Sequence, residues 1–263
     1  MPTTYAHYRF GCDVLGQLPA EARALIEKNR ELFDFGVHGP DLLFYYMPLK
    51  KNHVNQMGYR SHERTGRDFF TQAAEAVNAA KDRDAALAYL YGVLCHFTLD
   101  RECHPYVGRK EQTGVSHSAI EASFDRYLME KDGLDPVTHK VTSHLHPTPA
   151  SARVIAPFYA PIQKEEVYQA QRSMRFYLNL LVASGAKRKL LLSGMNLAGK
   201  ASMEDMFVPL HQNLACADSD EILFAHYQSA LGLYQSLFAE LNALLEGDPD
   251  ALGCGFDHTF GEV

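Results

Sequence analysis

The chain has 263 residues, a formal net charge of -7, 46% hydrophobic residues and five cysteines. These values suit one folded domain with a large core, and the acidic balance argues against nonspecific nucleic-acid binding. No apolar run approaches the roughly twenty residues of a membrane span, so we expect no transmembrane segment. The start Met1-Pro-Thr-Thr-Tyr5 lacks the basic and apolar blocks of a signal peptide, and an odd number of cysteines without Cys-x-x-Cys suggests reduced thiols. We therefore expect a cytoplasmic protein.

Hydrophobic periodicity predicts an all-α fold, a multi-helix bundle with additional C-terminal helices. The expected helices lie near 4–17, 19–34, 65–80, 83–101, 115–131, 163–184, 186–199 and 218–246. The proline-rich stretch from Gly133 to Pro161 predicts a long connection. We expect a single domain over 1–263, divided into a metal-site half (1–131), a loop (132–162), a C-terminal helical half (163–246) and a tail of poorly specified coil (247–263).

The first dense group of chemically active residues lies at the end of the apolar segment Ala85–Leu99. His96 and Asp100 are four residues apart, so on a helix both side chains leave the same face and can hold one ion. Pro105 disfavours the helical conformation at the residue before it, which predicts that His104 reaches back from a loop.

A second pair, His117 and Glu121, repeats the four-residue spacing on the next predicted helix. A capping box from Ser118 to Glu121 would spoil this relation, but a helix start near Thr113 removes the conflict. A histidine and an acid at this spacing often form only a hydrogen-bonded pair. Two such pairs with a third histidine between them favour a metal site, because zinc takes both ligand types.

These residues carry a resemblance to a known family. The four motifs are Thr-x-x-His7, Gly39-Pro40-Asp41, the run His-x3-Asp-x3-His that ends at His104, and the run His-Ser-x-x-Glu that ends at Glu121. Together they resemble the pattern of the zinc-dependent phospholipase C family. The likeness covers about positions 1 to 130. It implies an all-helical domain, related in fold to the S1/P1 nucleases, with three zinc ions at the base of a cleft.

The resemblance also implies ligand sets. Carried over residue by residue, one ion would be held by Asp41, His62, His96 and Asp100, a second by His7 and Asp100, and a third by His104, His117 and Glu121, with Asp41 also the candidate general base. Secreted members of the family complete the second site with their first residue. Here His7 follows Met1 by only six positions, so that site is completed by Pro2, by water, or not at all.

Two histidines compete for the place between Asp41 and His96. His62 precedes a predicted amphipathic helix, as the family pattern requires. His53 follows Lys50 and Lys51, which would repel a cation. We therefore favour His62 as the ligand.

The predicted chemistry is hydrolysis of a phosphoester. Three carboxylates against about six positive charges on three ions leave the site cationic, and paired zinc ions can lower the pKa of a bound water to about 7 and so supply hydroxide for in-line attack. We expect zinc as cofactor, with two or three ions, and a phospholipase C-like phosphodiesterase acting on a small phosphoester or lipid headgroup. The alternatives are an S1/P1-type nuclease, with Tyr45, Tyr46 and Tyr59 as stacking platforms, and a metal-stabilised helical binding protein without catalysis.

Several residues outside this half receive no role in the site. Toxins of the family append a membrane-docking β-sandwich, whereas positions 163–246 read as helix, which gives membrane docking no support. We expect the basic side chains of this segment to lie on a solvated helix face. We expect the histidines at 139, 144 and 146 to lie in a surface loop, and His226 to be a core residue whose hydrogen bonds are satisfied.

Overall fold

A computed structural model of the chain describes residues 4–261, except for the side chains of 201–203. Within this range the fold is all-α, as predicted, and an isolated bridge joins Thr65 to Thr259. The α-helices are α1 (Thr4–Leu15), α2 (Ala20–Lys28), α3 (Arg30–Gly36), α4 (His53–Glu63), α5 (Gly66–Asn78), α6 (Arg83–Glu111), α7 (His117–Lys131), α8 (Pro149–Ile155), α9 (Lys164–Leu181), α10 (Gly185–Leu197) and α11 (Ala217–Leu245). Short 3-10 helices are η1 (Gly39–Tyr45), η2 (Ala156–Tyr159), η3 (Ala201–Met206), η4 (Leu214–Cys216) and η5 (Cys254–Asp257).

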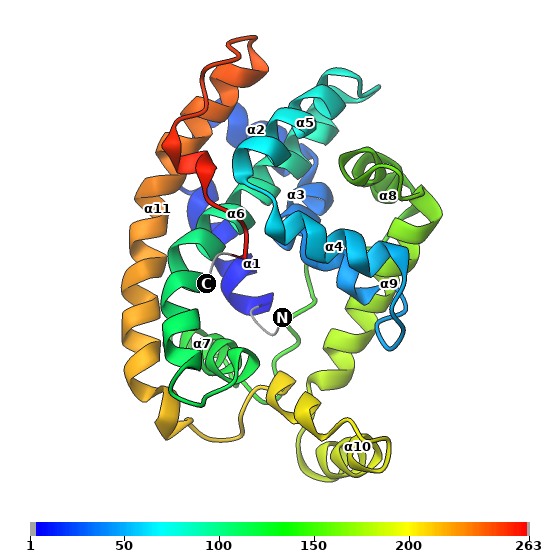
Figure 1. The fold of residues 1–263 in the computed structure, drawn as a ribbon, viewed down its shortest axis with the longest axis vertical. Helices are drawn as coiled ribbons and strands as arrows, with labels where there is room; N and C mark the ends of the chain where they lie inside the picture. The colour runs from blue at the N-terminus through cyan, green and yellow to red at the C-terminus, as the bar shows by residue number, and fades with distance from the viewer. Residues whose placement is uncertain (1–3, 262–263) are drawn as a thin grey trace.

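Helix α6 is the centre of the fold, with α1, α3, α5 and α11 packed around it (Figure 1). The Asp82 side chain caps its first turn by accepting a hydrogen bond from the Ala85 amide. Every residue from 85 to 100 is buried, because the apolar composition of this segment allows contacts on all sides. The polar side chains of His96 and Asp100 are therefore placed deep inside the protein, where polar groups need partners.

The predicted end of this helix near position 101 is wrong, and so is the loop placement of His104. Helix α6 continues through Pro105 to Glu111. An internal proline costs about 3 kcal/mol, but Cys103 and Val107 are buried on this part of the helix, which packs along α11. The continuation places Asp100 and His104 one turn apart on the same face.

A pair of glycines brings α3 close to α6. A Cβ atom on Gly92 would lie 2.4 Å from the backbone oxygen of Phe33, and one on Gly36 would lie 2.3 Å from that of Tyr89. The two helices can therefore approach only because both positions lack side chains. The segment that follows α3 is thereby held against α6, and η1 begins beside His96.

Other helix predictions need correction. The segment predicted as one helix over 19–34 is broken at Asn29 into α2 and α3, and α4 was not predicted, since its residues are mostly polar. The proline-rich connection contains α8 and η2. Helix α7 starts at His117 rather than near Thr113, with the Ser116 side chain accepting from the Ala119 amide.

The tail was predicted to be poorly specified coil, and its described part, to residue 261, is instead ordered against the core. Leu252, Phe256 and Phe260 are buried. The Gly66 amide donates to the backbone oxygen of His258, and the Gly261 amide donates to that of His62. The tail thus packs directly beside candidate site residues.

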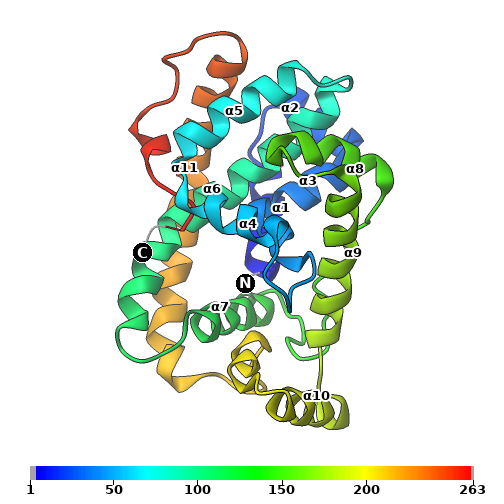
Figure 2. The same ribbon diagram turned by 45° about the vertical axis from the view of Figure 1, so that its right-hand side comes forward.

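Helix α10 lies at one end of the molecule, beyond α9, in both views (Figures 1 and 2). None of its residues is fully buried. Over residues 4–261, no helix is both long enough and apolar enough to cross a bilayer.

Candidate metal centre

The eight side chains predicted to bind metal converge within the fold. In the described part of the chain, three groups of side chains place potential ligand atoms within 4.8 Å of one another. The groups are Asp41 with His62 and His96, His7 with His96 and Asp100, and His104 with His117 and Glu121. This grouping follows the expected ligand sets closely, although it adds His96 to the group around His7 and leaves Asp100 out of the group around Asp41.

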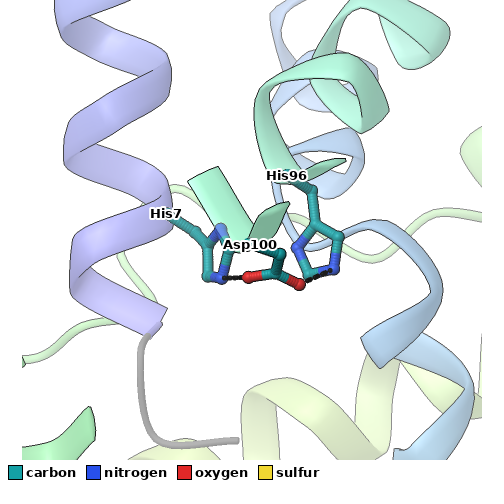
Figure 3. Close-up of side chains that lie close together, drawn as sticks. All are labelled: His7, His96 and Asp100. Carbon is teal, nitrogen blue, oxygen red and sulfur yellow. Dashed lines mark ion pairs between the residues drawn. The ribbon is translucent and has the colours of Figure 1, made fainter. Parts of the chain in front are cut away.

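Asp100 is the central acid of the arrangement. Its Oδ1 lies 3.2 Å from His7 Nε2 and 3.6 Å from His104 Nε2, and its Oδ2 lies 3.0 Å from His96 Nε2. Figure 3 shows the carboxylate between the imidazole of His7, from α1, and that of His96, from α6. Burial alone would raise the pKa of Asp100, but the imidazoles of His96, His104 and His7 hold that pKa well below its ordinary value.

Asp41 and His62 form the side of the centre nearest η1 and α4. Asp41 Oδ1 lies 2.9 Å from His62 Nε2 and 3.9 Å from His96 Nε2. The Nδ1 of His62 lies 2.8 Å from the backbone oxygen of Gly58, and donation to it leaves Nε2 as the ligating atom. His53 is far more open, with its side chain 64% exposed, and it pairs with Glu166 at 2.7 Å.

Gly39 allows η1 to come this close to His96. Its φ of +48° is in the left-handed region, which favours glycine. A Cβ atom there would lie 2.4 Å from Cδ2 of the His96 ring. The glycine of the Gly-Pro-Asp motif therefore allows η1 to pack directly against the His96 imidazole. The turn that follows brings Asp41 to face the same ring.

The third group lies where α6 meets α7. His117 Nε2 is 3.0 Å from Glu121 Oε1, and His104 Nε2 is 3.6 Å from the same oxygen. The Nδ1 of His104 faces the backbone oxygen of Phe260 at 3.0 Å, and the Nδ1 of His117 faces Glu111 Oε2 at 3.2 Å. Burial lowers the pKa of His117, but its carboxylate partners outweigh this and raise the pKa to about 9.

Glu111 and the Phe260 carbonyl were not predicted from the sequence. Both accept from the outer nitrogen of a histidine and so fix which nitrogen points inward, an arrangement typical of metal-bound histidines. Glu111 lies six residues before His117, across the turn between two helices, where no regular spacing indicates a contact. The aromatic residues of the tail were a signal that it packs on the core.

The buried polar atoms of the centre fit a divalent cation. Within the described residues, both ring nitrogens of His96, Nδ1 of His7, Nε2 of His62, Oδ1 of Asp41 and Oδ2 of Asp100 are buried without a well-formed hydrogen bond. Buried polar atoms are usually satisfied, and imidazole nitrogens with carboxylate oxygens are the donor set of zinc. Pro2, the residue considered for completing the second site, lies outside the described residues.

The remaining histidines lie outside the three groups. His144 is buried, which corrects the prediction of a surface position: its ring stacks on Tyr8 at 3.9 Å, and its Nε2 lies 2.8 Å from that of His38. These contacts join a loop to α1 and to the turn between α3 and η1, segments too distant in sequence to be paired by pattern. His139 is half-buried and His146 exposed, while His226 is half-buried beside Tyr106 rather than a full core residue.

No curated protein and no solved structure matches the chain. Residues 6–171 match the family described as zinc dependent phospholipase C. The match spans more than half of the chain and contains all eight residues of the centre, so it extends beyond the first 130 positions that carried the resemblance. The chain belongs to the zinc-dependent phospholipase C family.

Proposed function

We propose that this protein is a phosphoric ester hydrolase, a phospholipase C-like phosphodiesterase that uses two or three zinc ions. Family membership supports a metal-dependent hydrolase of the phospholipase type. The observation that carries the finer proposal is the convergence of His7, His96 and His104 on the single buried carboxylate of Asp100. The other two ligand groups lie beside it, one around Asp41 and one around Glu121.

The ligand sets of this proposal are those expected from the family resemblance. Asp41, His62 and His96 would hold one ion with Asp100, His7 and Asp100 a second, and His104, His117 and Glu121 a third. The three carboxylates together carry fewer charges than two or three divalent ions supply, so the loaded centre would attract a phosphate ester.

Bound zinc would polarise the phosphoryl oxygens and bring the pKa of water to about 7. Asp41 is the proposed general base: it would accept a proton from the attacking water while the new oxygen–phosphorus bond forms. The ester bond on the opposite side of phosphorus would break, the leaving alkoxide would take up a proton from solvent water, and Asp41 would return its proton to solvent. His62, with its ring held by the Gly58 carbonyl, would present Nε2 to the same ion as Asp41.

The test of this proposal also distinguishes two alternatives, a nuclease and a binding protein without catalysis. A nuclease would need aromatic faces on which bases stack; Tyr45 is buried, whereas Tyr59 is 56% exposed and packs against Phe44. A binding protein that retains its ions without catalysis would have the same ligand groups. We favour the phospholipase-type activity because the family match points to it.

Purified protein should contain zinc and should be assayed on phosphatidylcholine, a chromogenic phosphodiester and single-stranded DNA. We expect turnover of the first two substrates and a loss of at least about 100-fold in Asp41→Asn, the usual contribution of a general base. Asp84→Asn, an exposed acid at the start of α6, is the matched control and should retain full activity. Cleavage of DNA alone would support a nuclease, and bound zinc without turnover would support the binding protein; either result would refute the proposal.

We also propose that the protein resides in the cytoplasm, a reducing compartment. The proposal rests on the five cysteines, an odd number with no Cys-x-x-Cys motif. Three of them, Cys95, Cys103 and Cys216, are buried in the hydrophobic core, where they pack as small apolar side chains. Fractionation of the source cells would test this placement directly.

A further inference from the structure

The segment from α9 to the start of η3 has a charge opposite to that of the whole chain. Positions 167–203 contain no aspartate or glutamate, while the chain carries a net charge of -7. Within this segment the cationic residues are Arg172, Arg175, Lys187, Arg188, Lys189 and Lys200. A local basic region of this kind attracts anionic surfaces.

Helix α10 presents large apolar side chains to the outside. Leu190 is 75% exposed and Leu197, two turns later, is 92% exposed. On the neighbouring helix α9, Phe176 is 61% exposed. Leucine and phenylalanine beside lysine and arginine, on and next to a helix with no buried residue, are typical of helices that lie in the interface of a bilayer.

Two adjacent hollows lie between these elements and share Leu180. One, of about 570 Å³, is lined by Arg172, Arg175 and Lys187. The other, of about 350 Å³, is lined almost wholly by apolar residues of α9 and α10, together with Met206 and Phe207. A cationic hollow beside an apolar one matches the two parts of a lipid, an anionic phosphate and an acyl chain.

The apolar hollow reaches η1, the short helix that carries Asp41. Tyr45, in the same short helix η1 as Asp41, lines it. The loop after η1 also lines it with Pro48 and Leu49, the latter 64% exposed, and continues with Lys50 and Lys51. The loop therefore repeats the combination of exposed apolar and cationic side chains found on α10.

We propose that this surface, formed by α9, α10 and the loop 47–51 and here called the α9–α10 face, docks on a bilayer containing anionic lipids. The cationic hollow receives lipid phosphates, and the apolar hollow receives an acyl chain. This proposal rests on the proposed phosphoester hydrolysis, because docking would serve to bring lipid phosphoesters to the metal centre. The proposed contact is formed by two helices and a loop rather than by an appended β-sandwich, and the sequence alone does not indicate it because the exposure of Leu190 and Leu197 is not visible there.

The test is sedimentation of the zinc-loaded protein with vesicles of phosphatidylcholine alone and with added phosphatidylserine. We expect binding that increases with phosphatidylserine and decreases with salt. Lys189→Gln/Lys200→Gln should weaken binding by about 25-fold, about fivefold for each cation, and Leu190→Ala/Leu197→Ala should weaken binding to both vesicles. Lys28→Gln/Lys81→Gln, on exposed lysines outside this face, is the matched control and should bind like the unmodified chain.

Hydrolysis of a water-soluble chromogenic diester separates this proposal from the one it rests on. Loss of vesicle binding in the α9–α10 variants with unchanged diester hydrolysis supports docking. Diester hydrolysis without any vesicle binding overturns docking and leaves the hydrolase proposal intact, whereas vesicle binding without hydrolysis does the reverse. Dimerisation that the leucine double variant abolishes, without vesicle binding, would assign the face to a second copy and overturn the proposal.

Discussion

Replacement of Gly39 by alanine tests how the centre is assembled. The added Cβ atom would lie 2.4 Å from Cδ2 and 2.7 Å from Cγ of His96, so the ring or η1 must move by roughly 1 Å to reach an ordinary contact of about 3.4 Å. Overpacking of this kind costs about 1–3 kcal/mol. The left-handed backbone, with φ of +48°, adds about 1–2 kcal/mol for a residue with a side chain.

The expected result is a large loss of zinc affinity and activity in a protein that still folds. A misplacement of about 1 Å in a catalytic site lowers activity by roughly 100-fold, and His96 faces both Asp41 and Asp100. The assays are zinc affinity by competition with a chromophoric chelator, kcat/KM on a chromogenic diester, and the free energy of unfolding by denaturant.

Gly133→Ala is the matched control. Gly133 has a φ of +72° and nothing within 4 Å of an added Cβ atom, so this variant carries the backbone cost without the clash. It should lose about 1–2 kcal/mol of stability and keep full zinc affinity and activity. If Gly39→Ala retains the zinc affinity of the unmodified chain, or if the two variants behave alike, the contact between η1 and His96 does not set the geometry of the centre.

Three further changes test other parts of the structure. Glu111→Gln removes the carboxylate that faces His117 Nδ1 and should lower zinc affinity by about 10–100-fold; Glu63→Gln, on an exposed acid, is the control, and equal affinities in the two variants would argue against an orienting role. Phe260→Ala removes a fully buried ring from the tail and should lower the free energy of unfolding by about 3–5 kcal/mol in denaturant titrations; a loss below about 1 kcal/mol would show that the tail contributes little. Burial raises the pKa of Asp220 from 3.8 to about 6. The protonated carboxyl therefore contributes fully to the free energy of unfolding below pH 3.8, and this contribution is lost as the pH rises to about 6. The loss amounts to up to about 3 kcal/mol. Metal-free Asp220→Asn should therefore gain stability over the unmodified chain at pH 7.5 and not at pH 4, and a gain that is equal at both pH values would contradict this assignment.

Local spacing predicted much of the centre. His96 with Asp100 and His117 with Glu121 meet because residues four apart on a helix share a face, and this rule needs no knowledge of the fold. The choice of His62 over His53 rested on the charge of the neighbouring lysines, and the structure places His62 beside Asp41.

The misses have a common physical origin in tertiary contacts. The local cost of Pro105 predicted the end of a helix, but packing against α11 carries α6 through it. The tail around Phe260 and the burial of His144 depend on partners more than a hundred residues away, Phe260 on His104 and His144 on His38. Periodicity within a segment carries no information about such pairs.

The most direct measurement is anomalous X-ray scattering at the zinc edge from crystals of the zinc-loaded protein. We expect two or three peaks about 2.0–2.2 Å from the ligand atoms. One peak should lie between Asp41, His62 and His96, and another between His104, His117 and Glu121. Absence of zinc at both of these positions, with ions bound only at surface residues, would show that these side chains do not form a metal centre.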